Sequence, residues 1–415
     1  MRFGSDILKQ ADVLAGFTED APRVTRTYLT PQHRQAGNHL LALMREAGMD
    51  AGYDALGNVV GRYLAADPAA PVVMTGSHMD SVRNAGRYDG LFGILTAIAC
   101  ARDLAARGKR LPFTLEVVAF GDEEGVRFGV TLTGSKSMGG GFDPAWLDAK
   151  DADGITLREA LVAFGGDPDG WRALDRRGKG VVAYVESHIE QGPVLLNEGL
   201  PVGVVTAIAG GSRLRAKVTG LAGHAGTVPM GARRDALAAA AEMALAVERI
   251  ASQTPAGSPA VVGTVGMMSV MPGAINVIPQ DVAFTVDVRS AVDGARREAV
   301  AAMRESFQAT ARRRGVGVAA DVFYELDAAP CDPALQDALA ASIARQRVPV
   351  RRLPSGAGHD AMAFPAVCPI AMLFVRCGAG GISHHPDETL TAEDAEIATA
   401  VLLDFLEHYV PAPAR

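Results

Sequence analysis

Alternation of apolar, strand-like segments with helix-like segments constrains the fold of this chain more than any other feature. Residues 71–76, 113–120 and 180–189 are predicted strands whose cores are nearly continuously apolar. Helices are predicted near 33–47 and 90–106. Strands buried on both faces have this composition, and their alternation with helices is typical of an α/β fold. Strands at 51–53, 59–63 and 369–375 and a helix at 391–409 are expected in the same sheet domain.

The middle of the chain follows another pattern. Residues 212–220 and 282–290 alternate apolar and polar side chains, as strands with one buried face do. The predicted order is β-α-β-β-α-β, a split βαβ arrangement. Because 415 residues are long for one core, we expect an inserted domain at 210–325 within a discontinuous first domain of 1–209 and 326–415. Its other predicted elements are helices at 233–251 and 294–314 and strands at 261–270 and 316–325.

Charge and cysteine content exclude several classes of protein. The formal net charge of −7 argues against a nucleic-acid-binding protein. The run Arg312-Arg313-Arg314 is interpreted as the solvated last turn of a helix. No apolar run is long enough to cross a membrane, and the four cysteines form no paired motif. We therefore expect a cytoplasmic protein that binds neither nucleic acid nor membrane.

Histidine and acidic residues stand where the predicted strands end. In α/β sheets, ligands bind beyond the carboxyl ends of the strands. Buried histidines and carboxylates are costly there unless they are paired or bind a metal. A donor set without thiolates suits two divalent ions of the zinc type, since one carboxylate can bridge both. The residues concerned are His78, Asp89, Glu123, Glu124, His188 and the pair His384-His385.

Each of these residues also has an ordinary structural explanation. A single buried histidine is more often a core residue, and Glu123-Glu124 alone would usually be a solvated surface. Taken together at strand ends, they favour a metal site. Asp80 is then placed to hold the second ring nitrogen of His78. If Glu124 binds a metal, Glu123 can accept a proton from the attacking water.

Eight motifs of the chain resemble those of a known family. They are "GSHMDSV", "YDG", "DEEGVRF", "HIEQGP", "GHAGTVPM", "NVIP", "SGAGHDA" and "GISHHPDE". Their order is similar to that of the amidase–hydantoinase–carbamoylase branch of the dinuclear-zinc metallopeptidases, from about Ser5 to Tyr409. The resemblance implies a zinc-peptidase-like α/β/α catalytic domain. It also implies that the inserted ferredoxin-like domain serves as a lid and forms a homodimer.

The resemblance also implies a ligand set. Asp89 would bridge two metal ions, and the presence of a histidine at 188 resembles the amidase branch rather than the related peptidases. Glu123 would be the general base, and His385 would have no role. The implied ligands besides Asp89 are His78 and His188 at one ion, and Glu124 and His384 at the other.

Further site residues follow only from the resemblance. His224 would cross a dimer interface and stabilise the oxyanion in the partner's site. Asn276 and Arg289 would hold the substrate carboxylate, although Arg289 could instead be a surface charge on an alternating strand. The remaining implied substrate contacts are Gln191, Gly358 and His359.

The expected function is hydrolysis of a ureido or carbamoyl C–N bond in a small carboxylate-bearing substrate, with release of ammonia and CO2. Allantoate and N-carbamoyl-L-amino acids are the leading substrates, and zinc is the expected metal, with manganese or cobalt as alternatives. A related metallo-aminoacylase or dipeptidase is one alternative, which His188 disfavours. A catalytically silent binding protein is another, which the intact ligand set and Glu123 disfavour.

Overall fold

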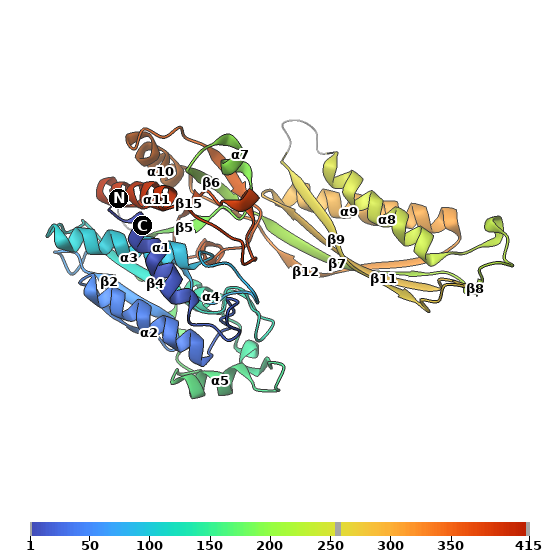
Figure 1. Ribbon diagram of the computed structural model, residues 1–415, viewed down its shortest axis with the longest axis horizontal. Helices are drawn as coiled ribbons and strands as arrows, with labels where there is room; N and C mark the ends of the chain where they lie inside the picture. The colour runs from blue at the N-terminus through green and yellow to red at the C-terminus, as the bar shows by residue number, and fades with distance from the viewer. Residues whose placement is uncertain (1, 254–258, 412–415) are drawn as a thin grey trace. The chain divides into compact units, whose positions relative to one another are not determined.

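A nine-stranded mixed sheet organises the first of two units into which the chain divides (Figure 1). The computed structural model describes residues 2–253 and 259–411. The first unit comprises Met1–Thr206, Pro330–Leu353 and His359–Arg415. The second comprises Ala207–Ala329 and Pro354–Gly358, and the expected inserted domain at 210–325 lies within it.

The strand order of the large sheet is β1-β2-β4-β3-β5-β15-β6-β13, with β14 paired to β6. The four strands from β4 to β15 are mutually parallel, which sets their carboxyl ends along one edge. The strands are β1 (Asp50–Tyr53), β2 (Val59–Tyr63), β3 (Val72–His78), β4 (Thr114–Phe120), β5 (Val181–Ile189), β6 (Val202–Ile208), β13 (Ala329–Pro330), β14 (Arg352–Ser355) and β15 (Ile370–Val375).

Both faces of this sheet are buried, which confirms the predicted α/β class. On β4, Val117 and Ala119 belong to the core shared with the long helices. Phe120 faces the other way and packs against Tyr184 and Phe364. Among the described residues, no helix has the length and apolar composition needed to cross a membrane. The helices of this unit are α1 (Gly4–Ala15), α2 (Pro31–Glu46), α3 (Leu91–Ala106), α4 (Thr133–Gly139), α5 (Leu157–Phe164), α6 (Trp171–Leu174), α7 (Val194–Glu198), α10 (Pro333–Arg345) and α11 (Ala392–His408).

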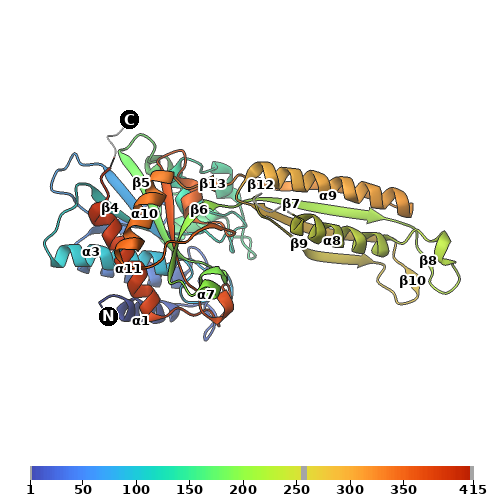
Figure 2. The same cartoon turned by 90° about the horizontal axis from the view of Figure 1, so that it is seen from above.

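The second unit is a four-stranded antiparallel sheet in the order β12-β7-β11-β9. Leu214, Ala216 and Val218 of β7 share one core with both long helices, which therefore cover a single face (Figures 1 and 2). This arrangement explains the alternating pattern of the sequence. The elements are β7 (Gly210–Thr219), β8 (Gly223–His224), α8 (Ala236–Ser252), β9 (Val261–Met271), β10 (Val277–Ile278), β11 (Asp281–Ser290), α9 (Asp293–Arg314) and β12 (Gly317–Leu326).

The start of α8 differs from the prediction of 233. The side chain of Asp235 accepts hydrogen bonds from the backbone N–H groups of Leu237 and Ala238, at 2.9 and 3.0 Å. It is therefore the N-cap, and the helix begins at Ala236. The residues before the cap form a separate segment with a short 3-10 turn at Met230–Ala232.

Candidate metal centre

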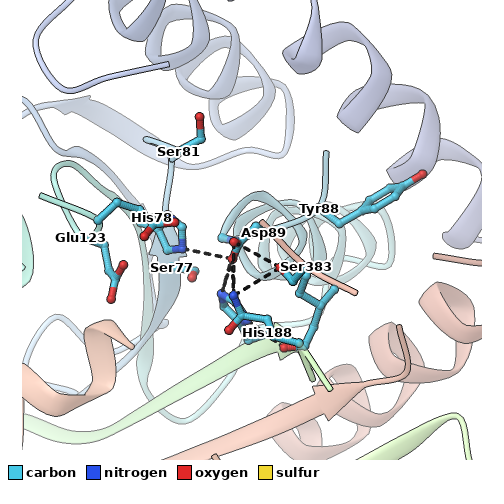
Figure 3. Close-up of polar contacts among 12 residues, drawn as sticks. Ser77, His78, Ser81, Tyr88, Asp89, Glu123, His188 and Ser383 are labelled. Carbon is cyan, nitrogen blue, oxygen red and sulfur yellow. Dashed lines mark hydrogen bonds and ion pairs between the residues drawn. The ribbon is translucent and has the colours of Figure 1, made fainter. Parts of the chain in front are cut away.

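Three imidazoles converge on the carboxylate of Asp89 at the carboxyl edge of the large sheet (Figure 3). The Nε2 atoms of His78 and His188 lie 3.6 and 3.2 Å from Asp89 Oδ1. The Nε2 atom of His384 lies 3.0 Å from Asp89 Oδ2. His78 ends β3, His188 lies near the end of β5, and Asp89 stands two residues before α3. Parallel strands thus bring these side chains to one point.

The hydrogen bonds of the Nδ1 atoms indicate which nitrogen of each ring carries the proton. Nδ1 of His78 lies 3.0 Å from the carbonyl oxygen of Asp80, and Nδ1 of His188 lies 2.9 Å from that of Ile189. A carbonyl oxygen can only accept, so we infer that both Nδ1 atoms carry the proton. In the neutral rings, both Nε2 lone pairs then face a carboxylate oxygen, and that of His188 also accepts from the backbone N–H of Gly90 at 3.3 Å. That arrangement is repulsive unless a cation or an additional proton lies between them.

Asp89 belongs to two groups of potential ligands. One group contains His78 and His188, and the other contains Glu124 and His384. In each group, one ligand atom per residue lies within 4.8 Å of the others. Imidazole and carboxylate donors arranged around a shared carboxylate fit two divalent ions of the zinc or manganese type. The donor chemistry and the converging lone pairs both agree with the expected metal.

The ionisation of the carboxyls reflects burial and their neighbours. Burial alone would raise the pKa of Asp89, but the three imidazoles, which in their protonated form donate to its carboxylate, outweigh burial and hold that pKa well below its ordinary value. Burial, reinforced by the charge of Asp89, raises the pKa of Glu124 to about 7. Burial also raises the pKa of Glu123 well above its ordinary value, against the opposing charge of His78.

Glu123 stands beside this centre. It shares a ligand-like group with His78 and Glu124, but it is in neither group that contains Asp89. In the view of Figure 3, it lies on the far side of His78 from Asp89. A half-buried carboxyl with a raised pKa next to a polar centre has the properties required of a general base.

Asp80 does not hold His78 in the way predicted. Its carboxylate oxygen lies 3.9 Å from His78 Nδ1, whereas its main-chain carbonyl makes the hydrogen bond. The carboxylate instead accepts from the backbone N–H groups of Glu123 and Glu124, at 3.1 and 3.3 Å. The chain turns directly after β3, so the carbonyl reaches the ring and the side chain reaches the neighbouring loop. Asp80 therefore fixes the two glutamates as well as His78.

Glu388 is a positioning residue that the sequence analysis missed. It is buried, and its Oε1 accepts from the backbone N–H groups of Tyr88 and Asp89, at 2.8 and 3.3 Å. Its Oε2 accepts from Ser383 Oγ at 2.7 Å. Its position within the "GISHHPDE" motif was the available signal. His385 of that motif is about half exposed and pairs with Asp387 rather than with Asp89.

Two predicted substrate contacts also lie near the centre. Nε2 of Gln191 lies 3.3 and 3.2 Å from the two carboxylate oxygens of Asp89. The His359 ring packs edge to face on His188, with centroids 4.5 Å apart. Burial lowers the pKa of His359 well below its ordinary value, so the ring is neutral. Gly358 is the last residue of the short segment that belongs to the second unit.

The other predicted residues belong to the second unit and divide between its two ends. His224 pairs with Val277 across β8 and β10, next to Asn276, and both His224 and Asn276 are exposed. Arg289 lies near the far end of β11, where it contacts Asp287 and donates to the carbonyl of Gly356 at 3.0 Å. The ten residues of β11 span about 30 Å. One copy of the chain therefore does not bring Asn276 and Arg289 together.

Comparison with known proteins shows which families and structures this chain is similar to. The family model described as Peptidase family M20/M25/M40 matches residues 74–408. N-carbamoyl-L-amino acid amidohydrolase of Geobacillus stearothermophilus is 40% identical, with 91% of each chain covered. Allantoate deiminase 2 of Glycine max is 38% identical, covering 92% of this chain and 85% of that protein. The crystal structure of a hydantoinase/carbamoylase family amidase from Burkholderia multivorans is 34% identical, with a TM-score of 0.90 and 97% of each chain covered.

Proposed function

The chain belongs to peptidase family M20/M25/M40, and from that premise we propose that it hydrolyses the carbamoyl or ureido C–N bond of a small carboxylate-bearing substrate. It is a hydrolase, like its amidohydrolase relatives. N-carbamoyl-L-amino acids are the first candidate substrates. Allantoate is the second, because an allantoate deiminase is almost as similar to this chain in sequence, at 38% identity against 40%. The observation that carries the hydrolytic assignment is the Asp89 carboxylate shared by two donor groups, with Glu123 beside them.

We propose that these groups hold two divalent ions, with zinc preferred and manganese or cobalt as alternatives. His78 and His188 would hold one ion, and Glu124 and His384 the other, with Asp89 common to both. When bound, such ions polarise a carbonyl group and lower the pKa of water. The hydrogen bonds of Nδ1 to main-chain carbonyls keep the His78 and His188 rings oriented for this task.

Glu123 is the proposed proton carrier. It accepts a proton from the attacking water and delivers it to the departing nitrogen. The backbone hydrogen bond to Asp80 fixes the peptide of Glu123, which limits the motion of the carboxyl group. Hydrolysis of a carbamoyl amide yields the free amine and carbamate, and carbamate breaks down to ammonia and CO2.

Arg289 and Gln191 are the side chains proposed to bind the substrate. The guanidinium of Arg289 can pair with a substrate carboxylate in a bidentate manner. Gly356, to which Arg289 donates, stands only three residues before His359 in the chain. Gln191 is a further proposed contact, because its amide already lies against Asp89.

A homodimer formed through the second unit is part of this proposal. His224 and Asn276 lie at one end of the unit and Arg289 near the other, so residues serving one site would come from two copies. The edge strand β9 supports this assembly. It exposes Val262, Met267 and Met271, whose relative exposures are 61%, 71% and 61%. An unpaired apolar edge is a typical site of association.

Ammonia release from a substrate panel tests the reaction. The panel contains N-carbamoyl-L-amino acids, allantoate, β-ureidopropionate and dipeptides, each assayed with and without a chelator. We expect turnover of at least one carbamoyl or ureido substrate, abolished by the chelator and restored by zinc, manganese or cobalt. Turnover of dipeptides alone would assign an aminoacylase or dipeptidase instead. Binding without turnover across the panel would indicate a silent binding protein.

A further inference from the structure

Five arginines line one cavity of about 500 Å³ in the second unit. The segment before α8 contributes two of them, and the last turn of α9 contributes three. The sequence pattern predicts an ordinary solvated helix end for the α9 run, whereas in the fold this run lines the same cavity as a second arginine pair. The arginines are Arg233, Arg234, Arg312, Arg313 and Arg314.

Two carboxylates lie close to this cavity, and each already has partners for at least one of its oxygens. Both oxygens of Glu242 pair with Arg313 and Arg314. Asp235 lines the cavity, but its Oδ1 caps α8 by accepting two backbone hydrogen bonds. Two acids therefore face five guanidinium groups, which leaves an excess of positive charge.

Two of the five arginines have no acidic partner within the described part of the chain. Neither Arg234 nor Arg312 forms an ion pair there, and both side chains are exposed to solvent. The Arg234 backbone is nevertheless fixed, because its carbonyl accepts from Leu221 N–H at 2.8 Å. Its side-chain stem approaches Gly315, where an added Cβ would lie 3.7 Å from both Cγ and Cδ. Arg234 is therefore held beside the end of α9.

Arg233 links the cavity to the loop that carries His224. Its Nη2 donates to the carbonyl of Ala225 at 2.6 Å, and its Nε donates to that of Val228 at 3.1 Å. A guanidinium has five N–H donors, so three remain for another acceptor. Arg233 can thus hold the loop and an anion at the same time.

We propose that this cavity binds a small phosphate-bearing anion and that the bound anion stabilises the loop at 224–229. A phosphate group offers several acceptor oxygens to the guanidinium groups that line the cavity, whereas a carboxylate offers two. The volume is within the range of small-molecule sites. The site differs from the metal centre in residues and in chemistry, and its occupancy does not depend on the proposed reaction.

Calorimetry of the full-length protein without substrate tests the binding. Inorganic phosphate, glycerol 3-phosphate and acetate are titrated at matched ionic strength. We expect saturable binding of a phosphate probe, and weaker binding of acetate. Tighter binding of glycerol 3-phosphate than of inorganic phosphate would identify an organic phosphate as the ligand. Acetate binding as tightly as either phosphate, or no phosphate binding, would overturn the proposal.

Arginine variants distinguish phosphate binding in this cavity from non-specific attraction of phosphate to a positively charged surface. Arg234→Gln and Arg312→Gln should each weaken phosphate binding by about tenfold or more, since each removes a charged donor. Arg304→Gln is the matched control, because Arg304 is an exposed residue of the same helix outside this cavity. Equal weakening by the control, or none by the cavity variants, would overturn the proposal.

Hydrogen exchange of the loop provides the second measurement. The Thr227 and Val228 amides hydrogen-bond to the His224 carbonyl, so phosphate should slow their exchange in the wild-type protein. The Arg234→Gln variant should lose most of this protection. Unchanged exchange under saturating phosphate would contradict the effect on the loop even if binding occurs.

Discussion

At the scale of single residues, the candidate centre depends on how buried polar groups satisfy one another. Asp89 is surrounded by imidazoles, and Glu388 holds its backbone N–H. Glu123 has no such direct contact with Asp89 and carries a raised pKa. This difference between two carboxyls supports the proposed roles of Asp89 as a ligand and Glu123 as a base, and it can be tested.

Glu123→Gln should separate chemistry from binding. The amide keeps the size of the side chain but cannot accept a proton, so kcat should fall by roughly 10²–10⁴. Metal content and KM should stay close to wild type, because Glu123 is outside both groups that share Asp89. Steady-state kinetics and metal analysis of the same preparation provide the measurement. Near-normal turnover would show that another residue acts as the general base.

His33 should make stability depend on pH. Its ring is fully buried between Tyr28 and Phe164. Burial, reinforced by the charges of nearby arginines, lowers its pKa to about 3. The folded state keeps His33 neutral, while the unfolded chain protonates it near pH 6.5. The contribution of neutral His33 to the free energy of unfolding is therefore fully present above pH 6.5. It is lost as the pH falls from 6.5 towards 3, by up to about 1.4 kcal/mol per pH unit.

His33→Phe should remove this contribution. Urea unfolding at pH 7, 6 and 5 should show a smaller fall in the free energy of unfolding than wild type shows. His408→Phe is the control, because His408 is exposed on the last turn of α11. Equal slopes for wild type and His33→Phe would show that His33 is not held neutral.

At the scale of elements, the turn between β3 and α3 decides the geometry of the centre. It delivers His78 at the end of the strand and Asp89 just before the helix. Gly90 completes the turn with a φ of +67°, and an added Cβ would lie 2.3 Å from the His78 carbonyl oxygen. Only glycine fits both the backbone angle and the close approach.

Gly90→Ala should therefore weaken both the fold and the metal centre. Gly108→Ala is a matched control beyond the other end of α3, where φ is +61° and an added Cβ meets nothing within 4 Å. The control should show only the conformational cost, about 1–2 kcal/mol. Gly90→Ala should cost more and should also lower the metal retained after gel filtration. Identical stability and metal content in the two variants would refute the steric argument.

At the scale of the whole molecule, the division of the predicted site residues is the main feature. The second unit places His224 and Arg289 near opposite ends of its sheet. The proposed homodimer, in which His224 would enter the partner's site, would account for this separation. It would also make each site the product of two chains.

Mixing two inactive variants tests this assembly. His224→Ala and Glu123→Gln homodimers should each be nearly inactive. A heterodimer would contain one site with both defects and one with neither. Random exchange should thus restore about a quarter of wild-type activity, since half of the dimers are mixed and half of their sites are intact. Heterodimers detected by mass without any recovery would show that His224 does not act across the interface.

The sequence by itself determined the secondary structure and fold class, because these follow from the local pattern of apolar and polar residues. Continuous apolar runs predicted the central strands of the large sheet, and alternation predicted two strands of the second unit, at 212–220 and 282–290, because side-chain periodicity follows from strand geometry. Position at strand ends brought His78 and His188 to one edge, and family motifs singled out His384. Helix α10 and strand β6 were not anticipated.

Tertiary structure alone decided which groups meet across long separations in sequence. Glu388 reaches Asp89 from 299 residues away, and the main chain of Asp80, rather than its carboxylate, contacts His78. The arginine run of α9 faces Arg233 and Arg234 only because α8 and α9 pack side by side in the second unit. Local spacing determines which face of an element a side chain occupies. The packing of elements determines which partner it meets there, and that depends on the whole chain.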